Sequence, residues 1–134
     1  SVADREENIR RASEMASLLV KQNISVVASF TTPTAACRTI LANTLNASQL
    51  IEIYCQCSIN MCEVRDPKGF YHRARLANLT DVVGWDLPFL PPKNPALVLD
   101  TEHQSIAHNQ NQIRQLIGKS PVKESGLSRF VHWP

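Results

Sequence analysis

The sequence predicts an α/β domain with a mostly parallel sheet. Short apolar runs rich in β-branched residues alternate along the chain with segments whose apolar residues recur at helical spacing. No proline interrupts these runs, which are expected to form strands at 24–30, 50–57 and 96–100. Strands that alternate with helices build βαβ units, so the strands should lie parallel in one sheet. The length of 134 residues fits one domain, expected at 1–117, followed by a tail at 118–134.

The first two helices are predicted from capping residues. Asp4 followed by Glu7 is a capping-box pattern, which predicts a helix over 4–22. Thr32-Pro33 has the pattern of a cap followed by proline at the first helical position, which predicts a second helix over 34–43.

A rigid corner is expected between two short helices in the middle of the chain. Pro67 fixes its own φ, and Gly69 permits a left-handed backbone. One helix should therefore end near Arg65 and the next should begin near Phe70, with Lys68 held at the break. A lysine flanked by arginines at such a corner is suited to bind an anion. The alternative interpretation is a solvated basic helix face.

The last third of the chain is predicted to contain a loop, a helix and a tail. Residues 80–95 include four prolines and are expected to form a long ordered loop or lid. A helix is expected over 102–117, with Ile106 facing inward and Gly118 ending it. The apolar and aromatic residues at 127–133 suggest that the tail docks on another surface.

Composition excludes several functional classes. A net charge of +2 is too small to indicate binding to nucleic acid or to a membrane. No apolar run approaches the roughly 20 residues of a membrane span. The first residues are polar and of mixed charge, unlike a signal peptide, so a cytoplasmic location is predicted.

The cysteines are expected to be buried free thiols. A zinc site would need Cys-x-x-Cys pairs or Cys/His clusters, which the sequence lacks, so no metal site is predicted. The four cysteines suit a reducing compartment and are Cys37, Cys55, Cys57 and Cys62.

The carboxyl ends of the predicted strands suggest where a ligand binds. In open α/β sheets, ligands bind beyond these ends. Residues 30–33 and the pair Cys57-Ser58 lie there, so they are candidate walls of a site.

Five stretches resemble the adenylylsulfate kinase family in order and spacing. They are DREENIRR at 4–11, SFTTP at 29–33, RDPKGFY at 65–71, GWDLP at 84–88 and NPALVLDT at 94–101. The resemblance covers about residues 4–117. It implies a P-loop-kinase-like, three-layer α/β/α fold. The implied activity is ATP-dependent 3′-phosphorylation of adenylylsulfate to 3′-phosphoadenylylsulfate in sulfate assimilation, with Mg-ATP as the phosphate donor.

The same resemblance implies roles for individual residues. Arg65 would lie near the ATP adenine, and Lys68 would reach the anionic groups of adenylylsulfate. Arginine offers a fork to phosphate or sulfate oxygens, and lysine offers a point charge. The residues implied to bind adenylylsulfate are Arg5, Asn8, Phe30, Thr31, Thr32 and Lys68.

The sequence also departs from the family pattern. No G-x-x-x-x-G-K-[ST] phosphate loop occurs in the 134 residues, so no catalytic residue is assigned and this chain alone is expected to be inactive. Ala35 replaces an arginine of the family, Val82 replaces the phenylalanine that stacks on the substrate adenine, Val83 replaces a threonine, and Leu90 replaces an acidic residue.

The missing phosphate-loop strand affects the expected sheet. In this family that strand lies between the strands that match 24–30 and 50–57. Without it, those two strands are expected either to pair directly or to leave an open slot, which favours a homo-oligomer, a borrowed strand or contact with a missing N-terminal segment. Three interpretations stay open: the body of a kinase, a catalytically inactive nucleotide-binding regulatory domain, or a structural remnant that oligomerises through 127–133.

Overall fold

Helices and strands alternate along most of the chain. The computed structural model describes residues 1–46, 48–119 and 128–132. The helices of this part span Val2–Lys21 (α1), Ala35–Thr44 (α2), Ile59–Arg65 (α3), Phe70–Leu76 (α4) and Ile106–Lys119 (α5). The strands span Val26–Phe30 (β1), Leu50–Gln56 (β2), Leu97–Asp100 (β3) and Ser128–His132 (β4). The predicted α/β class with a parallel sheet is confirmed.

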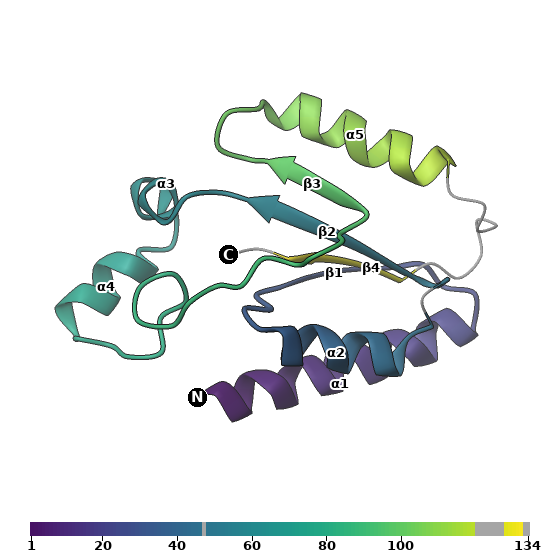
Figure 1. Cartoon of the computed structure of the whole chain (residues 1–134), viewed down its shortest axis with the longest axis horizontal. Helices are drawn as coiled ribbons and strands as arrows, with labels where there is room; N and C mark the ends of the chain where they lie inside the picture. The colour runs from purple at the N-terminus through teal and green to yellow at the C-terminus, as the bar shows by residue number, and fades with distance from the viewer. Residues whose placement is uncertain (47, 120–127, 133–134) are drawn as a thin grey trace.

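Helices cover both faces of the sheet. The strands run parallel in the order β1-β4-β2-β3. In Figure 1, α1 and α2 lie below the sheet and α5 lies above it, while α3 and α4 extend beyond the carboxyl end of β2. Among the described helices, none is both long and apolar enough to span a membrane.

One core lies between the sheet and the helices α1 and α2. Val26, Ala28 and Phe30 of β1 pack against buried residues that include Ile9 of α1. Successive side chains of a strand point to opposite faces. Val27 therefore faces away from this core, and its side chain is 70% exposed.

A second core lies on the face under α5. Ile51, Ile53 and Cys55 of β2 are buried there together with Leu99 of β3, and Ile113 of α5 packs against them. Leu50 of β2 packs against the first core, so both faces of β2 are covered and its position in the sheet is fixed.

The capping box predicted at Asp4 and Glu7 is wrong. The cap of α1 is Ser1, whose hydroxyl accepts a hydrogen bond from the backbone N–H of Asp4 at 3.2 Å. Glu7 accepts hydrogen bonds from Arg10 and Arg11 instead, each at 2.7 Å. The bonds from Arg10 and then Arg11 lower the pKa of Glu7 to about 2.

The start of α2 also differs from the prediction. Thr34 is the cap, and its hydroxyl accepts from the backbone N–H of Cys37 at 3.3 Å. Pro33 therefore precedes the cap and is not the first helical residue. Thr32 is fully buried, and its carbonyl accepts from Arg38 Nη1 at 2.8 Å.

Helix α5 begins later than predicted. The Asp100 carboxylate accepts backbone N–H groups of Glu102 at 3.0 Å and His103 at 2.9 Å, which folds the first predicted turn into a separate loop. Ile106 then starts the helix and is 78% exposed, so the prediction that it faces inward is wrong. Gly118 does not end the helix, which continues for one more residue.

Strand β4 lies between β1 and β2, where the sequence predicted direct pairing or an open slot. Its residues pair in parallel with both neighbours, so that Val131 is opposite Ser29 on β1 and opposite Ile53 on β2. Both expectations for this part of the sheet are therefore wrong. Segment 128–132 of the predicted tail supplies backbone donors and acceptors to both flanking strands.

Candidate functional site

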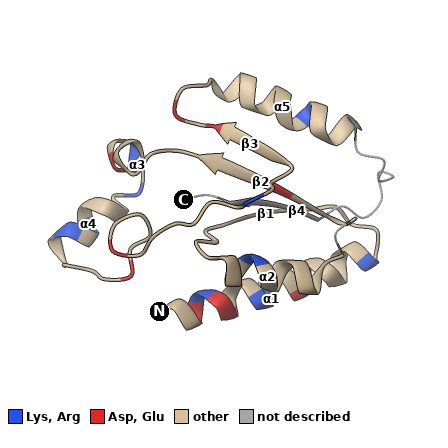
Figure 2. Cartoon of the chain, viewed as in Figure 1, with Lys and Arg blue, Asp and Glu red and all other residues tan. Residues whose placement is uncertain are grey.

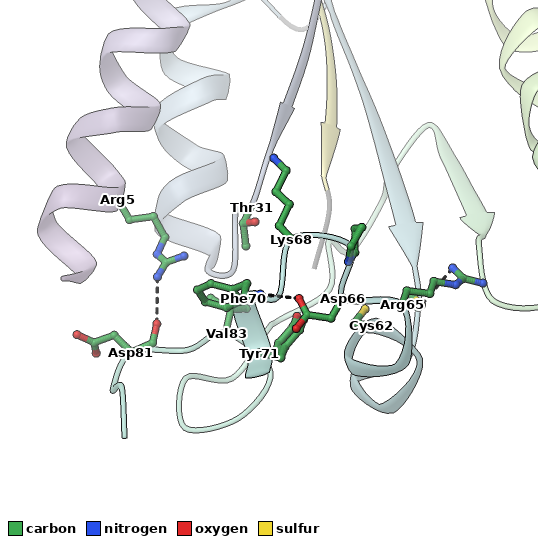
Figure 3. A pocket seen from close by; sticks show the side chains of 12 residues that line it. Arg5, Thr31, Cys62, Arg65, Asp66, Lys68, Phe70, Tyr71, Asp81 and Val83 are labelled. Carbon is green, nitrogen blue, oxygen red and sulfur yellow. Dashed lines mark hydrogen bonds between the residues drawn. The ribbon is translucent and has the colours of Figure 1, made fainter. Parts of the chain in front are cut away.

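A cavity of about 520 Å³ lies beyond the carboxyl ends of β1 and β2. The start of α1, the end of β1, the corner between α3 and α4, and the loop after α4 each contribute to its wall (Figure 3). The residues that line it are Arg5, Thr31, Cys57, Cys62, Arg65, Asp66, Pro67, Lys68, Phe70, Tyr71, Asp81 and Val83.

The corner between α3 and α4 is built as the sequence predicts. Helix α3 ends at Arg65, α4 begins at Phe70, and Gly69 adopts a left-handed φ of 64°. The Asp66 carboxylate accepts the backbone N–H groups of Phe70 at 2.7 Å and His72 at 3.0 Å. Desolvation raises the pKa of Asp66. The backbone N–H donors, led by His72 and Phe70, together lower it by more than desolvation raises it, so the pKa lies below its usual value.

Asp66 therefore caps the start of α4 as a carboxylate. Its charge is directed at the backbone of the helix, where a negative group is stabilised by the unpaired N–H groups of the first turn. Lys68, two residues later, is exposed at the rim of the cavity.

Arg5 reaches the cavity from α1 with an unused donor. One of its terminal nitrogens donates to the Asp81 carbonyl at 3.3 Å. Its Nε is buried and has no hydrogen-bond partner within the described residues. A buried guanidinium N–H is costly to leave without an acceptor, so this nitrogen favours an acceptor group at the cavity.

Positive charge comes to the cavity from separate elements. In Figure 3, Arg5 and Lys68 approach the space beside Thr31, while Arg65 points away from them. Arg65 Nη1 instead donates to Cys57 Sγ at 3.9 Å. Figure 2 places Lys and Arg residues near the start of α1, on α3 and on α4 at this end of the molecule.

The structure brings together four of the seven residues that the sequence analysis proposed for binding. The four that line the cavity are Arg5, Thr31, Arg65 and Lys68. Asn8, Phe30 and Thr32 do not line it. Asn8 is exposed on the surface of α1, beside Asp4, Glu7 and Arg11. Phe30 packs into the core between the sheet and the helices α1 and α2. Thr32, which follows Thr31 in the sequence, is fully buried.

Several lining residues were not proposed as binding residues. Phe70 and Tyr71 follow Gly69 directly in the RDPKGFY stretch, so their sequence position was a usable signal. Burial is the main cause that raises the pKa of Tyr71, which keeps its phenol protonated near neutral pH. Asp81 and Val83 come from the long loop, where no periodic pattern indicates which side chains face inward.

The loop after α4 is held by a cluster that includes a tryptophan. Trp85 Nε1 donates to Glu63 at 2.5 Å, and Glu63 also pairs with Arg75. The Arg75 guanidinium lies 4.8 Å from the centre of a Trp85 ring, and Tyr71 packs 5.4 Å from Trp85. We call Glu63, Tyr71, Arg75 and Trp85 the Trp85 cluster. It ties the loop to α3 and α4.

A second set of hydrogen bonds shapes the same loop. Asp86 accepts the backbone N–H groups of Asp81 and Val82, both at 2.7 Å. Val82 is 3% exposed, so this turn is anchored in the interior. The predicted lid segment is thus an ordered wall that carries Asp81 and Val83 into the cavity.

Acidification is expected to release the Trp85 cluster. Hydrogen bonds from Arg75 and then Trp85 lower the pKa of Glu63. This carboxylate therefore contributes stability above the ordinary glutamate pKa, and the contribution is lost as pH falls through the lowered value. In a Trp133→Phe background, the fluorescence of Trp85 should change over that acidic range, and Glu63→Gln should remove the transition.

Glu14→Gln is the matched control for this experiment, because Glu14 pairs with Arg10 on the exposed side of α1. It should leave the acid transition of Trp85 unchanged. An identical transition in Glu63→Gln would show that another group controls the loop.

The described residues contain no group of three or more His, Cys, Asp or Glu side chains placed to hold a metal ion. The cysteines are free, as expected, although Cys57 is only partly buried. The lining of the cavity combines basic, aromatic and thiol groups with the two acidic residues Asp66 and Asp81.

Comparison with known proteins identifies the family. The family model described as adenylylsulphate kinase matches residues 1–100. The chain belongs to this family. An adenylyl-sulfate kinase of Oceanobacillus iheyensis is 42% identical over 113 residues, which cover 84% of this chain and 57% of the relative. One from Geotalea uraniireducens is 44% identical over 101 residues, which cover 75% of this chain and 49% of the relative.

Solved structures of similar fold agree with this family assignment. The Mycobacterium tuberculosis APS kinase, determined in complex with AMPPNP and APS, superposes with a TM-score of 0.75 at 32% identity, covering 89% of this chain and 69% of that one. The protein named APE1195 gives a TM-score of 0.77 at 32% identity, covering 88% and 67%. The predicted P-loop-kinase-like fold is confirmed, and the chain spans about half to three fifths of its curated relatives.

Proposed function

We propose that this chain forms the adenylylsulfate-binding part of an adenylylsulfate kinase. The whole enzyme would transfer a phosphoryl group from Mg-ATP to the ribose 3′-hydroxyl of adenylylsulfate, giving 3′-phosphoadenylylsulfate. The observation that carries the proposal is the shared cavity of Arg5 and Lys68, in which Arg5 Nε is buried without a partner within the described residues.

The chemistry of the cavity supports an anionic nucleotide as the ligand. A guanidinium and an ammonium from different elements can contact separate oxygens of a phosphate or sulfate. Phe70 and Tyr71 offer aromatic surface beside these cations, which suits a base or a ribose. That APS is bound by the M. tuberculosis kinase supports the same ligand here.

The described residues do not fit the magnesium and phosphate part of the reaction. They contain no metal-binding cluster, and the 134 residues contain no G-x-x-x-x-G-K-[ST] loop. We therefore assign no magnesium ligand and derive no phosphoryl-transfer step from this chain. Arg65 is kept as a candidate contact for the ATP adenine, although its side chain points away from Arg5 and Lys68 (Figure 3).

A catalytically inactive nucleotide-binding domain is the second candidate function. It is favoured by the place of β4, which lies between β1 and β2. The resemblance assigns that place in the sheet to the phosphate-loop strand of the family.

For either function, the 134-residue chain is expected to bind adenylylsulfate without forming 3′-phosphoadenylylsulfate when ATP is added. Chromatographic detection of ATP-dependent product would contradict this expectation. Cytoplasmic location and association with a second copy stay predictions.

Lys68→Ala should weaken adenylylsulfate binding more than Lys93→Ala. Both lysines are exposed, but Lys68 lines the cavity of Arg5, whereas Lys93 lines a separate groove beside α2. A charge-assisted contact is worth about 1.5–3 kcal/mol, so Lys68→Ala should raise the dissociation constant roughly 10- to 100-fold. Titration calorimetry with the two variants measures the difference, and equal affinities would argue against the proposed site.

A further inference from the structure

Two cysteines meet at the start of α3, on the wall of the cavity. Ser58 is the cap of this helix, so Cys57 immediately precedes the cap and Cys62 is the fourth helical residue. Side chains at these two positions pack against each other at many helix starts, where they form a hydrophobic staple. The backbone geometry of this helix start therefore favours contact between the two thiols.

Further contacts agree with this placement. Both cysteines line the cavity, and Cys57 is among the groups close enough to raise the pKa of Cys62. Cys57 is partly exposed and receives a hydrogen bond from Arg65, while Cys62 is 7% exposed. Reactive thiols occur in partly exposed, electropositive surroundings, and a second thiol in contact can resolve the first reaction product.

We propose that Cys57 and Cys62 are an oxidisable thiol pair, in which Cys57 reacts first with a small-molecule disulfide and Cys62 completes an intramolecular disulfide. This assignment does not depend on which nucleotide the cavity binds. Because both sulfurs belong to the cavity wall, the oxidised form would have an altered wall beside Arg65.

The reaction is balanced with glutathione disulfide as the oxidant. Cys57 sulfur attacks one glutathione sulfur, the glutathione S–S bond breaks, and one glutathione leaves as a thiol after gaining the proton lost by Cys57. Cys62 sulfur then attacks Cys57 sulfur in the mixed disulfide, and the second glutathione leaves with the proton of Cys62. Two protein thiols are oxidised, and one glutathione disulfide is reduced to two thiols.

The other cysteines differ from this pair in their surroundings. Cys37 lies in α2 and is 1% exposed, and Cys55 lies in the core under α5 and is 5% exposed. Burial raises the pKa of Cys55 to about 11. Burial, followed by the proximity of Cys57, also raises the pKa of Cys62 to about 11, which fits a thiol that acts second.

Mass spectrometry of the full 134-residue chain tests the pair. After treatment with glutathione disulfide, the monomer mass should fall by two hydrogens and should return after reduction with dithiothreitol. Cleavage with trypsin and then with cyanogen bromide, which cuts after Met61, separates Cys57 from Cys62. The fragments 39–61 and 62–65 should stay joined until they are reduced.

Variants decide which sulfurs take part. Cys57→Ser and Cys62→Ser should each abolish the loss of two hydrogens, whereas Cys37→Ser and Cys55→Ser should retain it. Fragment 39–61 also contains Cys55, so the fragment analysis is repeated on Cys55→Ser, where it remains decisive if Cys62→Ser does not fold. No mass loss, a stable glutathione adduct on the wild-type chain, or a disulfide that persists in Cys57→Ser would overturn the proposal.

Discussion

Val131→Pro is expected to abolish cooperative unfolding of the 134-residue chain. Val131 lies in β4 and is paired on both sides, opposite Ser29 and Ile53. Proline removes the backbone donor, and it is rarely tolerated in a central strand. A partner carbonyl left unpaired costs about 1–3 kcal/mol, and disruption of the strand separates β1 from β2. A domain of this size is stable by only about 5–15 kcal/mol.

Val131→Ala is the matched control because it keeps the backbone N–H. Circular dichroism should record a single melting transition for Val131→Ala and a broad or absent one for Val131→Pro. If both variants melt at the wild-type temperature with wild-type cooperativity, then β4 does not hold the centre of the sheet in solution.

Arg5→Ala should weaken adenylylsulfate binding roughly 10- to 100-fold, the range expected for losing a charge-assisted contact of about 1.5–3 kcal/mol. Arg5 carries the buried Nε that has no partner within the described residues, and it lines the cavity. Its hydrogen bond to the Asp81 carbonyl is long at 3.3 Å, so the guanidinium can turn toward a bound anion at small cost.

Arg11→Ala provides the comparison on the same helix. Arg11 pairs with Glu7, is 74% exposed, and does not line the cavity. Calorimetry should give a dissociation constant near the wild-type value for Arg11→Ala and a much larger one for Arg5→Ala. Melting curves of both variants check that each is folded. Equal binding by the two variants would rule out Arg5 as a ligand contact.

Local features of the fold could be predicted from the sequence because each depends on neighbouring residues. The corner at Arg65–Phe70 follows from the preferences of Pro67 and Gly69. The caps of α1 and α2 were misplaced by a few residues, since several adjacent hydroxyl and carboxylate side chains could each have served. The geometry selected Ser1 and Thr34.

The central position of β4 could not be predicted, because it depends on contacts between distant parts of the chain. Its short sequence carries no signal that names β1 and β2 as neighbours. For the same reason, only part of the site could be predicted from the sequence. Arg5 and Lys68 were identified by resemblance, but only the folded chain distinguishes the lining residue Thr31 from its buried neighbour Thr32.

The position of β4 also sets an order of events during synthesis. Val26 pairs with Ser128, so β1 must wait for β4, about 100 residues later in the chain, before this part of the sheet can close. Contacts between residues so far apart in sequence carry a high entropic cost of loop closure and are associated with slow folding. Until β4 has been synthesised, β1 and β2 lack this shared neighbour, and the backbone groups that β4 pairs on both strands are open to other chains.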